Sequence, residues 1–342
     1  MVATTDGAKT WDVIGLGNAL VDALVVMEDD ALIEAQGLKR GTMHLVDHDR
    51  WTELYESVQD HPVTFESGGS CANTIAAIGL LGGRSLYRGQ VGDDPMGRTY
   101  AQRLEEACGG HALHFTKSHP TGKCLSIISG PDAERTMLTD LGASTALDFL
   151  GPLADAIRGC KVAHFTGYTL LDGAIREPTI DAMRLARNAG AKVSLDAADP
   201  FVVMQIRDLL WTLLSEYVDI VFLNADEAEG LTGKTAEEAA EEVATRGKVQ
   251  TVVVKLGSRG SIVYHDGQAH KVDIFRVDAK DTTGAGDAYA GGFLYGLVSD
   301  WPLHACGELG SRVAALAVAQ VGAVVKDRNL LQRAATDVRA RL

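Results

Sequence analysis

The spacing of hydrophobic residues along the chain switches repeatedly between two patterns. Short apolar runs of five or six residues alternate with segments in which apolar side chains recur every three or four positions. The first pattern is typical of buried β-strands and the second of helices. Strands are predicted at 11–16, 161–165, 191–195, 218–223 and 251–255, and helices at 70–81, 179–188, 285–298 and 308–320. This alternation predicts a parallel sheet covered by helices on both faces.

Two stretches depart from this alternation. Extended segments are predicted at 20–27 and 41–46 around a short helix, and at 123–129 and 135–141 around a turn at Gly130-Pro131-Asp132. These four strands predict a small second sheet that projects from the main domain. We therefore expect an α/β/α sandwich with a mainly parallel central sheet and a β-sheet lid. The expected segments are 11–17, 60–118 and 142–342 for the core, and 18–59 and 119–141 for the lid.

The charge of the chain excludes several classes of partner. Its 342 residues carry a formal net charge of -14, without a run rich in Lys or Arg. Such a surface repels nucleic acid and anionic lipid. Neither a signal segment nor an apolar run of the roughly 18 residues expected of a membrane span is present. We therefore expect a cytoplasmic protein without nucleic-acid or membrane partners, whose five cysteines form neither a disulfide framework nor a zinc site.

The most specific motif is D-T-T-G-A-G-D at residues 281–287, which directly precedes a predicted helix. Small residues at Gly284, Ala285 and Gly286 allow close backbone approach, and the first N–H groups of a helix form an anion site. Asp287, in the first turn, can accept the proton of an attacking hydroxyl while those N–H groups hold a transferring phosphoryl group. A capped helix start with an acidic first turn is the simpler alternative, but the seven-residue string is far more specific than such a start.

This string resembles the C-terminal signature of the ribokinase-like (PfkB) kinases. The resemblance implies transfer of the γ-phosphoryl group of ATP to a hydroxyl, with Asp287 as catalytic base and Gly284, Ala285 and Gly286 as the anion hole. It also implies Mg²⁺ and, as a further candidate, a monovalent cation such as K⁺. The expected mechanism is direct in-line transfer at the carboxyl ends of the strands. The enzyme is expected to be a monomer or a homodimer.

A second stretch, Gly68-Gly69-Ser70-Cys71-Ala72-Asn73, resembles the other signature of the family. By resemblance, Gly68, Gly69, Ser70 and Asn73 belong to the substrate site. A glycine turn followed by Ser70 as helix N-cap is the structural alternative. A third stretch, 17–22, supplies Asn18 and Asp22, which the resemblance places at the substrate hydroxyls.

Two further segments are expected at the nucleotide. Asn224 and Glu227 form an N-x-x-E pattern, which the resemblance assigns to Mg²⁺ through water, although the same pattern is a helix capping box. Both roles are compatible. The K-x-G-x-x-G segment contributes Lys255, Gly257 and Gly260, with a plain hairpin turn as the alternative. Thr283 is also expected at the nucleotide.

Within the family, the adenosine kinases are the most similar. By that resemblance Tyr168 lies against a purine, and Met137, Thr139 and Leu141 alternate on a lid strand to line the base pocket. Arg135 is expected to meet the phosphates when the lid closes. Thr283 and Met43 stand where mammalian adenosine kinases have Asn and Gln, which removes two amides that would contact the nucleoside.

Three other functions compete with an adenosine kinase. A kinase for ribose or a ketose is the first, and a nucleoside-binding protein without catalysis is the second, although an intact Asp287 argues against it. An NAD-dependent oxidoreductase is disfavoured because Leu20 replaces the third glycine of the dinucleotide fingerprint and no helix follows. A Walker A motif is missing, which disfavours a P-loop fold.

Overall fold

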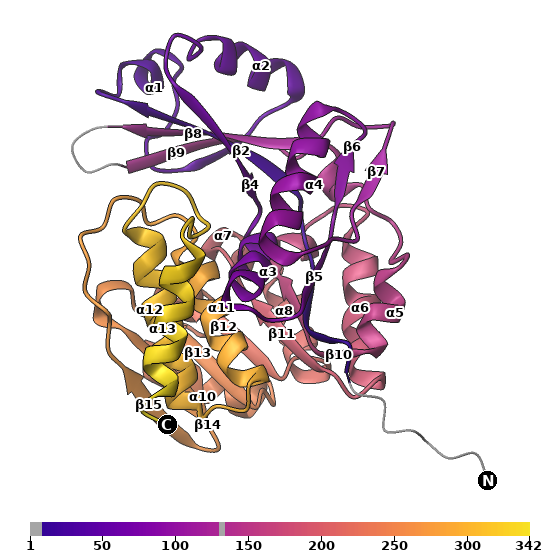
Figure 1. Ribbon diagram of the computed structural model, residues 1–342, viewed down its shortest axis with the longest axis vertical. Helices are drawn as coiled ribbons and strands as arrows, with labels where there is room; N and C mark the ends of the chain where they lie inside the picture. The colour runs from indigo at the N-terminus through magenta and orange to yellow at the C-terminus, as the bar shows by residue number, and fades with distance from the viewer. Residues whose placement is uncertain (1–8, 130–133) are drawn as a thin grey trace.

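The computed structural model describes residues 9–129 and 134–342, which form one large sheet, a smaller second sheet and a separate two-stranded sheet (Figure 1). The smaller second sheet lies above one end of the larger α/β domain, and its strand β2 (Leu20–Met27) directly follows β1 (Trp11–Leu16) of that domain. This arrangement confirms the predicted fold class. The turn expected at Gly130-Pro131-Asp132 lies outside the described residues.

The large sheet is parallel except at one edge. Its six neighbouring strands from β13 (Thr251–Lys255) to the edge strand β5 (Ser85–Arg88) pair in parallel. Strand β14 (Ser261–His265) pairs antiparallel with β13 on one side and with β15 (Gln268–Val272) on the other. The strand order is β15 (Gln268–Val272), β14 (Ser261–His265), β13 (Thr251–Lys255), β12 (Ile220–Asn224), β11 (Lys192–Asp196), β10 (Cys160–Thr166), β1 (Trp11–Leu16), β5 (Ser85–Arg88).

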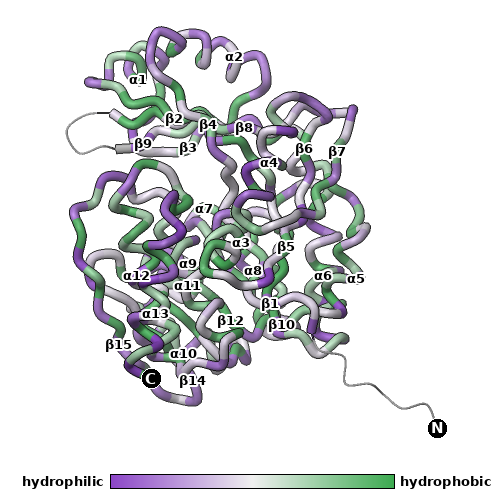
Figure 2. Tube along the Cα trace, viewed as in Figure 1, coloured by the Kyte–Doolittle hydropathy of each residue, from purple (hydrophilic) through white to green (hydrophobic). Residues whose placement is uncertain are grey.

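Helices bury both faces of this sheet, as the continuous apolar runs predict. In β12, Ile220 and Phe222 join the hydrophobic cluster on one face, while Val221 and Leu223 join the cluster on the other. Figure 2 shows hydrophobic residues concentrated in this interior and hydrophilic residues at the outer turns. The helices on the face of Ile220 and Phe222 are α3 (Ser70–Leu81), α11 (Ala285–Val298), α12 (Leu303–Val318) and α13 (Arg328–Arg339). The helices on the face of Val221 and Leu223 are α5 (Leu153–Arg158), α6 (Arg176–Asn188), α8 (Arg207–Glu216), α9 (Ala225–Thr232) and α10 (Ala236–Arg246).

The lid is a sheet of five described strands. Their order is β3 (Met43–Leu45), β9 (Glu134–Asp140), β8 (Gly122–Ser129), β2 (Leu20–Met27), β4 (Val63–Gly68). Alternate residues such as Ala23 and Leu125 pack under α1 (Ala31–Ala35) and α2 (His48–Glu56), whereas Asp22 and Cys124 line the opposite side. Four of these strands were predicted. The fifth, β4, lies in the segment 60–118 that was assigned to the core, and its polar Glu66 and Ser67 concealed it.

The remaining elements connect these layers. They are β6 (Gln90–Gly92), α4 (Pro95–Cys108), β7 (His114–Thr116), α7 (Pro200–Gln205) and the 3₁₀ turns η1 (Gly142–Thr145), η2 (Gly167–Leu170) and η3 (Gly257–Arg259). Two helices begin earlier than predicted. Helix α6 starts at Arg176 because Pro178 is tolerated in a first turn, and α12 starts at Leu303, directly after Pro302.

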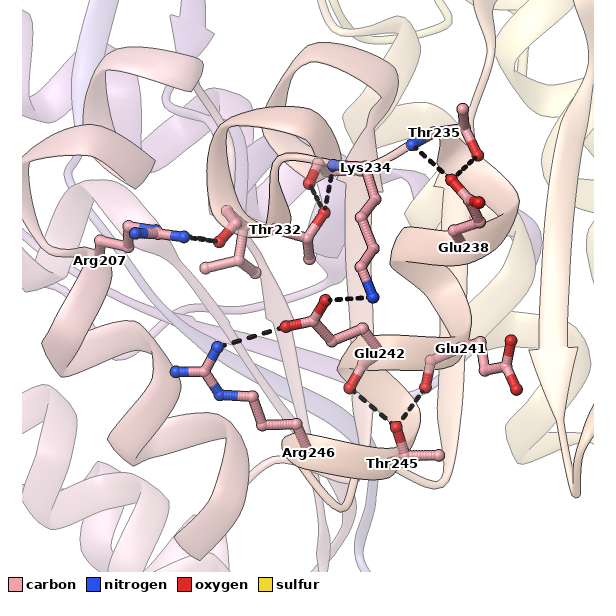
Figure 3. Close-up of polar contacts among 11 residues, drawn as sticks. Arg207, Thr232, Lys234, Thr235, Glu238, Glu241, Glu242, Thr245 and Arg246 are labelled. Atoms are coloured by element: carbon pink, nitrogen blue, oxygen red, sulfur yellow. Dashed lines mark hydrogen bonds and ion pairs between the residues drawn. The ribbon is translucent and has the colours of Figure 1, made fainter.

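Polar side chains hold the turn between α9 and α10 at the surface (Figure 3). The Thr235 hydroxyl donates to Glu238 at 2.8 Å, and Glu242 pairs with Lys234 at 3.0 Å and with Arg246 at 3.2 Å. Surface ion pairs of this kind add little to stability, because water screens both charges. The buried apolar face of α10 therefore fixes this helix on the sheet.

Candidate active site

A cavity of about 1170 Å³ lies between the lid and the carboxyl ends of the parallel strands. The residues that line it come from all the segments singled out in the sequence. The predicted residues that it brings together are Asn18, Asp22, Gly69, Ser70, Asn73, Arg135, Met137, Thr139, Leu141, Tyr168, Asn224, Glu227, Lys255, Gly257, Gly260, Thr283, Gly284, Ala285, Gly286 and Asp287. The exception is Gly68, which does not line the cavity. A side chain on Gly68 would meet the Asp22 carboxylate at 2.3 Å, so this glycine leaves room for Asp22.

Helix α11 begins at the centre of the cavity. Gly284 is its N-cap with a φ of 70°, in the left-handed region that favours glycine, and a Cβ there would lie 2.5 Å from the Ala323 Cβ. The first N–H groups of the helix have no intrahelical acceptors and carry the positive end of its dipole. The helix thus begins with the geometry that the predicted anion site requires, and anion binding itself stays a prediction.

Asp287 is fixed beside this helix start by donors from α3. Its Oδ1 accepts the Ser70 hydroxyl at 2.6 Å, and its Oδ2 accepts the Asn73 amide at 2.8 Å. Burial raises the pKa of Asp287 to about 6, although these two hydrogen bonds oppose the shift. A carboxylate with this pKa is deprotonated at neutral pH and basic enough to accept a proton from a hydroxyl.

Two asparagines that line the cavity each have a buried amide oxygen without a hydrogen-bond partner in the described structure. Asn18 Nδ2 donates to the Ser144 carbonyl at 3.3 Å, and Asn73 Nδ2 donates to Asp287, but the Oδ1 atom of each asparagine is unpaired. An unmade hydrogen bond of a buried polar atom costs about 1–3 kcal/mol. Each oxygen is therefore a candidate acceptor for a further hydrogen bond.

The lid residue Arg135 lies near two carboxylates, Asp22 of the cavity wall and Asp281, which does not line the cavity. Its guanidinium donates to the Ser126 hydroxyl at 2.7 Å and lies 3.8 Å from Asp22 and 4.0 Å from Asp281. Burial raises the pKa of Asp22 to about 6, and the Arg135 charge opposes that rise. Burial also acts to raise the pKa of Asp281, but hydrogen bonds from the N–H group of Gly322 and from Thr283 hold that pKa below its ordinary value.

Asn224 and Glu227 form a closed capping box at the start of α9. The Glu227 N–H donates to Asn224 Oδ1 at 2.8 Å, while the two Glu227 oxygens accept the Asn224 N–H at 2.8 Å and the Asn224 amide at 2.6 Å. Burial, followed by the negative charge of Asp196, raises the pKa of Glu227 to about 7. The capping role is thus present, and the same pair lines the cavity.

The K-x-G-x-x-G segment is both a turn and part of the cavity wall. It joins β13 to the antiparallel β14 through η3, and the Leu256 N–H donates to the Gly260 carbonyl at 2.8 Å. Lys255 Nζ forms a 2.7 Å ion pair with Asp196, which the sequence patterns did not single out. Asp196 ends a buried strand, and its position at a carboxyl end is the only sequence signal that it offers.

Apolar side chains form a large part of the cavity lining, and we call this part the apolar wall. Tyr168 lies there with the predicted lid residues Met137 and Leu141, and with Met43. The sequence did not identify several further apolar residues, because they lie in turns or on faces without a distinctive motif. These residues are Leu45, Leu171, Ile175, Ile274, Val277, Ala314, Ala315 and Val318, together with Phe201 and Phe275.

Comparison with known proteins identifies the family. A family model described as pfkB family carbohydrate kinase matches residues 38–328. The chain belongs to this family. The kinase is 29% identical to the adenosine kinase of Schizophyllum commune over 344 aligned residues, which cover 92% of this chain and 96% of that protein.

Two solved structures share the whole fold of the kinase. The adenosine kinase of Sinorhizobium meliloti is 32% identical with a TM-score of 0.87, and the match covers 98% of this chain and 100% of that one. A probable sugar kinase from Rhizobium etli CFN 42 is 31% identical with a TM-score of 0.89, over 97% of this chain and 99% of that one. The kinase is therefore a phosphotransferase that acts on a hydroxyl group, and its use of ATP is implied.

Within residues 9–129 and 134–342, three or more His, Cys, Asp or Glu side chains nowhere form a cluster suited to a metal ion. Over the same residues, the helices are too short or too polar to cross a bilayer.

Proposed function

We propose that this kinase transfers the γ-phosphoryl group of ATP to the 5′-hydroxyl of adenosine or a close purine analogue. The observation that carries the proposal is the apolar wall of the cavity, where Tyr168 and Phe201 accompany Met137 and Leu141. Aromatic and apolar side chains stack well on a flat base. A free pentose would leave this wall uncovered.

The polar part of the cavity suits the ribose of such a nucleoside. Asn18 and Asn73 offer unpaired amide oxygens, and Asp22 offers a carboxylate. Each of these groups accepts hydrogen bonds, and the hydroxyls of ribose donate them. With the ribose held there, we propose that Asp287 accepts the proton of the attacking hydroxyl while the first N–H groups of α11 hold the charge of the phosphoryl group.

The residues present fit a hydrated Mg²⁺ ion that accompanies the nucleotide. Both carboxylate oxygens of Glu227 are engaged by Asn224, so direct ligation would break the capping box, whereas contact through water would leave it intact. Mg²⁺ keeps several waters and is usually held by one or two carboxylates together with phosphates. We propose that Asn224 and Glu227 hold the ion in this way, and that its charge offsets that of the phosphates. A role for a monovalent cation such as K⁺ stays a prediction from the family resemblance.

A sugar kinase is the second candidate. Thr283 and Met43 line the cavity without an amide, and a probable sugar kinase shares the fold at 31% identity. A coupled ADP-release assay over nucleosides and sugars at equal sub-saturating concentration separates the two. Faster turnover of adenosine, inosine or guanosine supports the proposal, and faster turnover of ribose or fructose replaces it with the sugar kinase.

A further inference from the structure

Three neighbouring strands end side by side at the floor of the cavity. Strand β12 lies between β11 and β13, and Asn224 at its end is in register with Lys255 on β13. Adjacent strands lie about 4.8 Å apart, so β11 and β13 are separated by roughly twice that distance. Lys255 nevertheless pairs with Asp196 of β11 at 2.7 Å. Its side chain therefore crosses the end of β12.

Asp196 is held rigidly for this contact. Its side chain is buried, its Oδ2 accepts the Lys255 ammonium, and its Oδ1 accepts the Ala198 N–H at 3.1 Å. Ala198 has a φ of 76°, in the left-handed region that non-glycine residues rarely adopt. The chain thus bends immediately after β11 in a conformation that the Asp196 carboxylate stabilises.

The Lys255 ammonium lies against the start of α11. A Cβ on Gly286 would lie 3.0 Å from Lys255 Nζ. A cation at the N-terminus of a helix is unfavourable, because both carry positive charge. A carboxylate that pairs with Lys255 is therefore needed to hold it in this position. The arrangement becomes favourable when an anion binds next to both the Lys255 ammonium and the N-terminus of α11.

The protonation of Lys255 depends on this surrounding negative charge. Burial alone lowers the pKa of a lysine, but Asp196, Glu227 and Asp287 together raise the pKa of Lys255 above its ordinary value. The ammonium is therefore retained in a buried position where, without Asp196, desolvation would favour the neutral amine.

We propose that Asp196 is a positioning residue for phosphoryl transfer, which holds the Lys255 ammonium against the first turn of α11 so that it meets the terminal phosphate of the nucleotide. The proposal rests on the binding of ATP at this end of the cavity and is independent of the acceptor. Asp196 acts only through Lys255 and does not itself contact the phosphate.

Nucleotide affinity measured without acceptor tests this role. Isothermal titration with Mg²⁺ and either AMP-PNP or ADP compares the wild type with D196N, K255M and the double variant D196N/K255M. D196N and K255M should each weaken AMP-PNP binding by about tenfold or more, and ADP binding by less, since the contact concerns the terminal phosphate. A loss that is equal for both nucleotides would assign Asp196 a merely structural role and would overturn the proposal.

The double variant tests whether Asp196 acts through Lys255. If it does, D196N/K255M should bind AMP-PNP within about twofold of K255M alone, because coupled residues are not additive. A loss equal to the product of the two single losses would contradict the proposal. The double variant removes both charges together, so it also serves if D196N alone does not fold.

Asp219 provides a matched control at the opposite end of the sheet. It pairs with Arg187 and accepts the Val193 N–H at 2.8 Å, far from the cavity wall. D219N should change the melting temperature and leave nucleotide affinity unchanged. Wild-type protein that fails to bind AMP-PNP would contradict the kinase assignment itself, whereas wild-type affinity retained in D196N would contradict only the positioning role.

Discussion

The Ser70 hydroxyl donates a 2.6 Å hydrogen bond to Oδ1 of Asp287, although the two residues are 217 positions apart. This bond joins the first turn of α3 to the first turn of α11, and the Asn73 amide fixes the other carboxylate oxygen. The two motifs that the sequence places far apart therefore form one unit. Ser70 and Asn73 orient the proposed base, while α11 supplies the anion site beside it.

Substitution of this base should abolish most turnover. D287N removes the proton acceptor, and loss of a general base typically lowers kcat by about 10²–10⁴-fold. The coupled ADP-release assay measures the loss. D327N, which alters an exposed helix cap at the start of α13, should keep wild-type turnover. Near-wild-type kcat in folded D287N would show that Asp287 is not the base.

The acid limb of the pH profile should report Asp287. Because burial raises its pKa to about 6 and the base must be deprotonated, kcat/KM for the acceptor should rise as pH increases through about 6 and then level off. Asp22 has a similar raised pKa. D22N should therefore lower activity but keep the acid limb of the pH profile. If the acid limb disappears in D22N, it reports the titration of Asp22 instead of Asp287.

The same pKa predicts how Asp287 affects stability. Its folded pKa of about 6 exceeds the ordinary value of 3.8, so the folded state binds the proton more tightly than the unfolded state. Its contribution is fully present below pH 3.8 and is lost as pH rises through about 6. D287N should therefore raise the melting temperature relative to wild type at pH 7.5 and show a much smaller difference at pH 4. An equal difference at both pH values would rule out this linkage.

Glu227 should act on Mg²⁺ dependence more than on stability. E227Q preserves the shape of the side chain and one acceptor oxygen for the capping box, but removes the buried negative charge. We expect a higher Mg²⁺ concentration for half-maximal rate. E238Q provides a matched control, because Glu238 closes the capping box of α10 at the surface. Indistinguishable Mg²⁺ profiles for E227Q and wild type would leave Glu227 with the capping role alone.

The sequence predicted the parts of this molecule that local patterns determine. The buried runs of β1 and β13 and the helices α3 and α11 have the predicted bounds, since apolar periodicity and glycine-rich starts are local signals. Strand β4 was not predicted, because its pairing with β2 is a long-range contact that local sequence does not reveal, and because several of its residues are polar. Asp196 was missed for a similar reason, since its proposed role depends on a lysine 59 positions away.

Tyr168 should distinguish nucleosides from sugars. Its ring lines the apolar wall of the cavity, and its hydroxyl donates to Asp199 at 3.4 Å. Stacking of a base on an aromatic ring is worth about 1–3 kcal/mol, which corresponds to roughly tenfold to a hundredfold in affinity. Y168A should therefore raise KM for adenosine by this factor and hardly change KM for any sugar that the enzyme accepts.

Y168F separates the ring from its hydroxyl. This variant keeps the stacking surface and loses only the contact with Asp199. Its KM for adenosine should stay within about threefold of wild type, because a donor–acceptor distance of 3.4 Å is near the limit for a hydrogen bond. Steady-state kinetics on adenosine and ribose with wild type, Y168A and Y168F give the comparison. Equal increases of KM for both acceptors in Y168A would mean that Tyr168 shapes the cavity without contacting a base. In that case the apolar wall would no longer favour a nucleoside over a sugar.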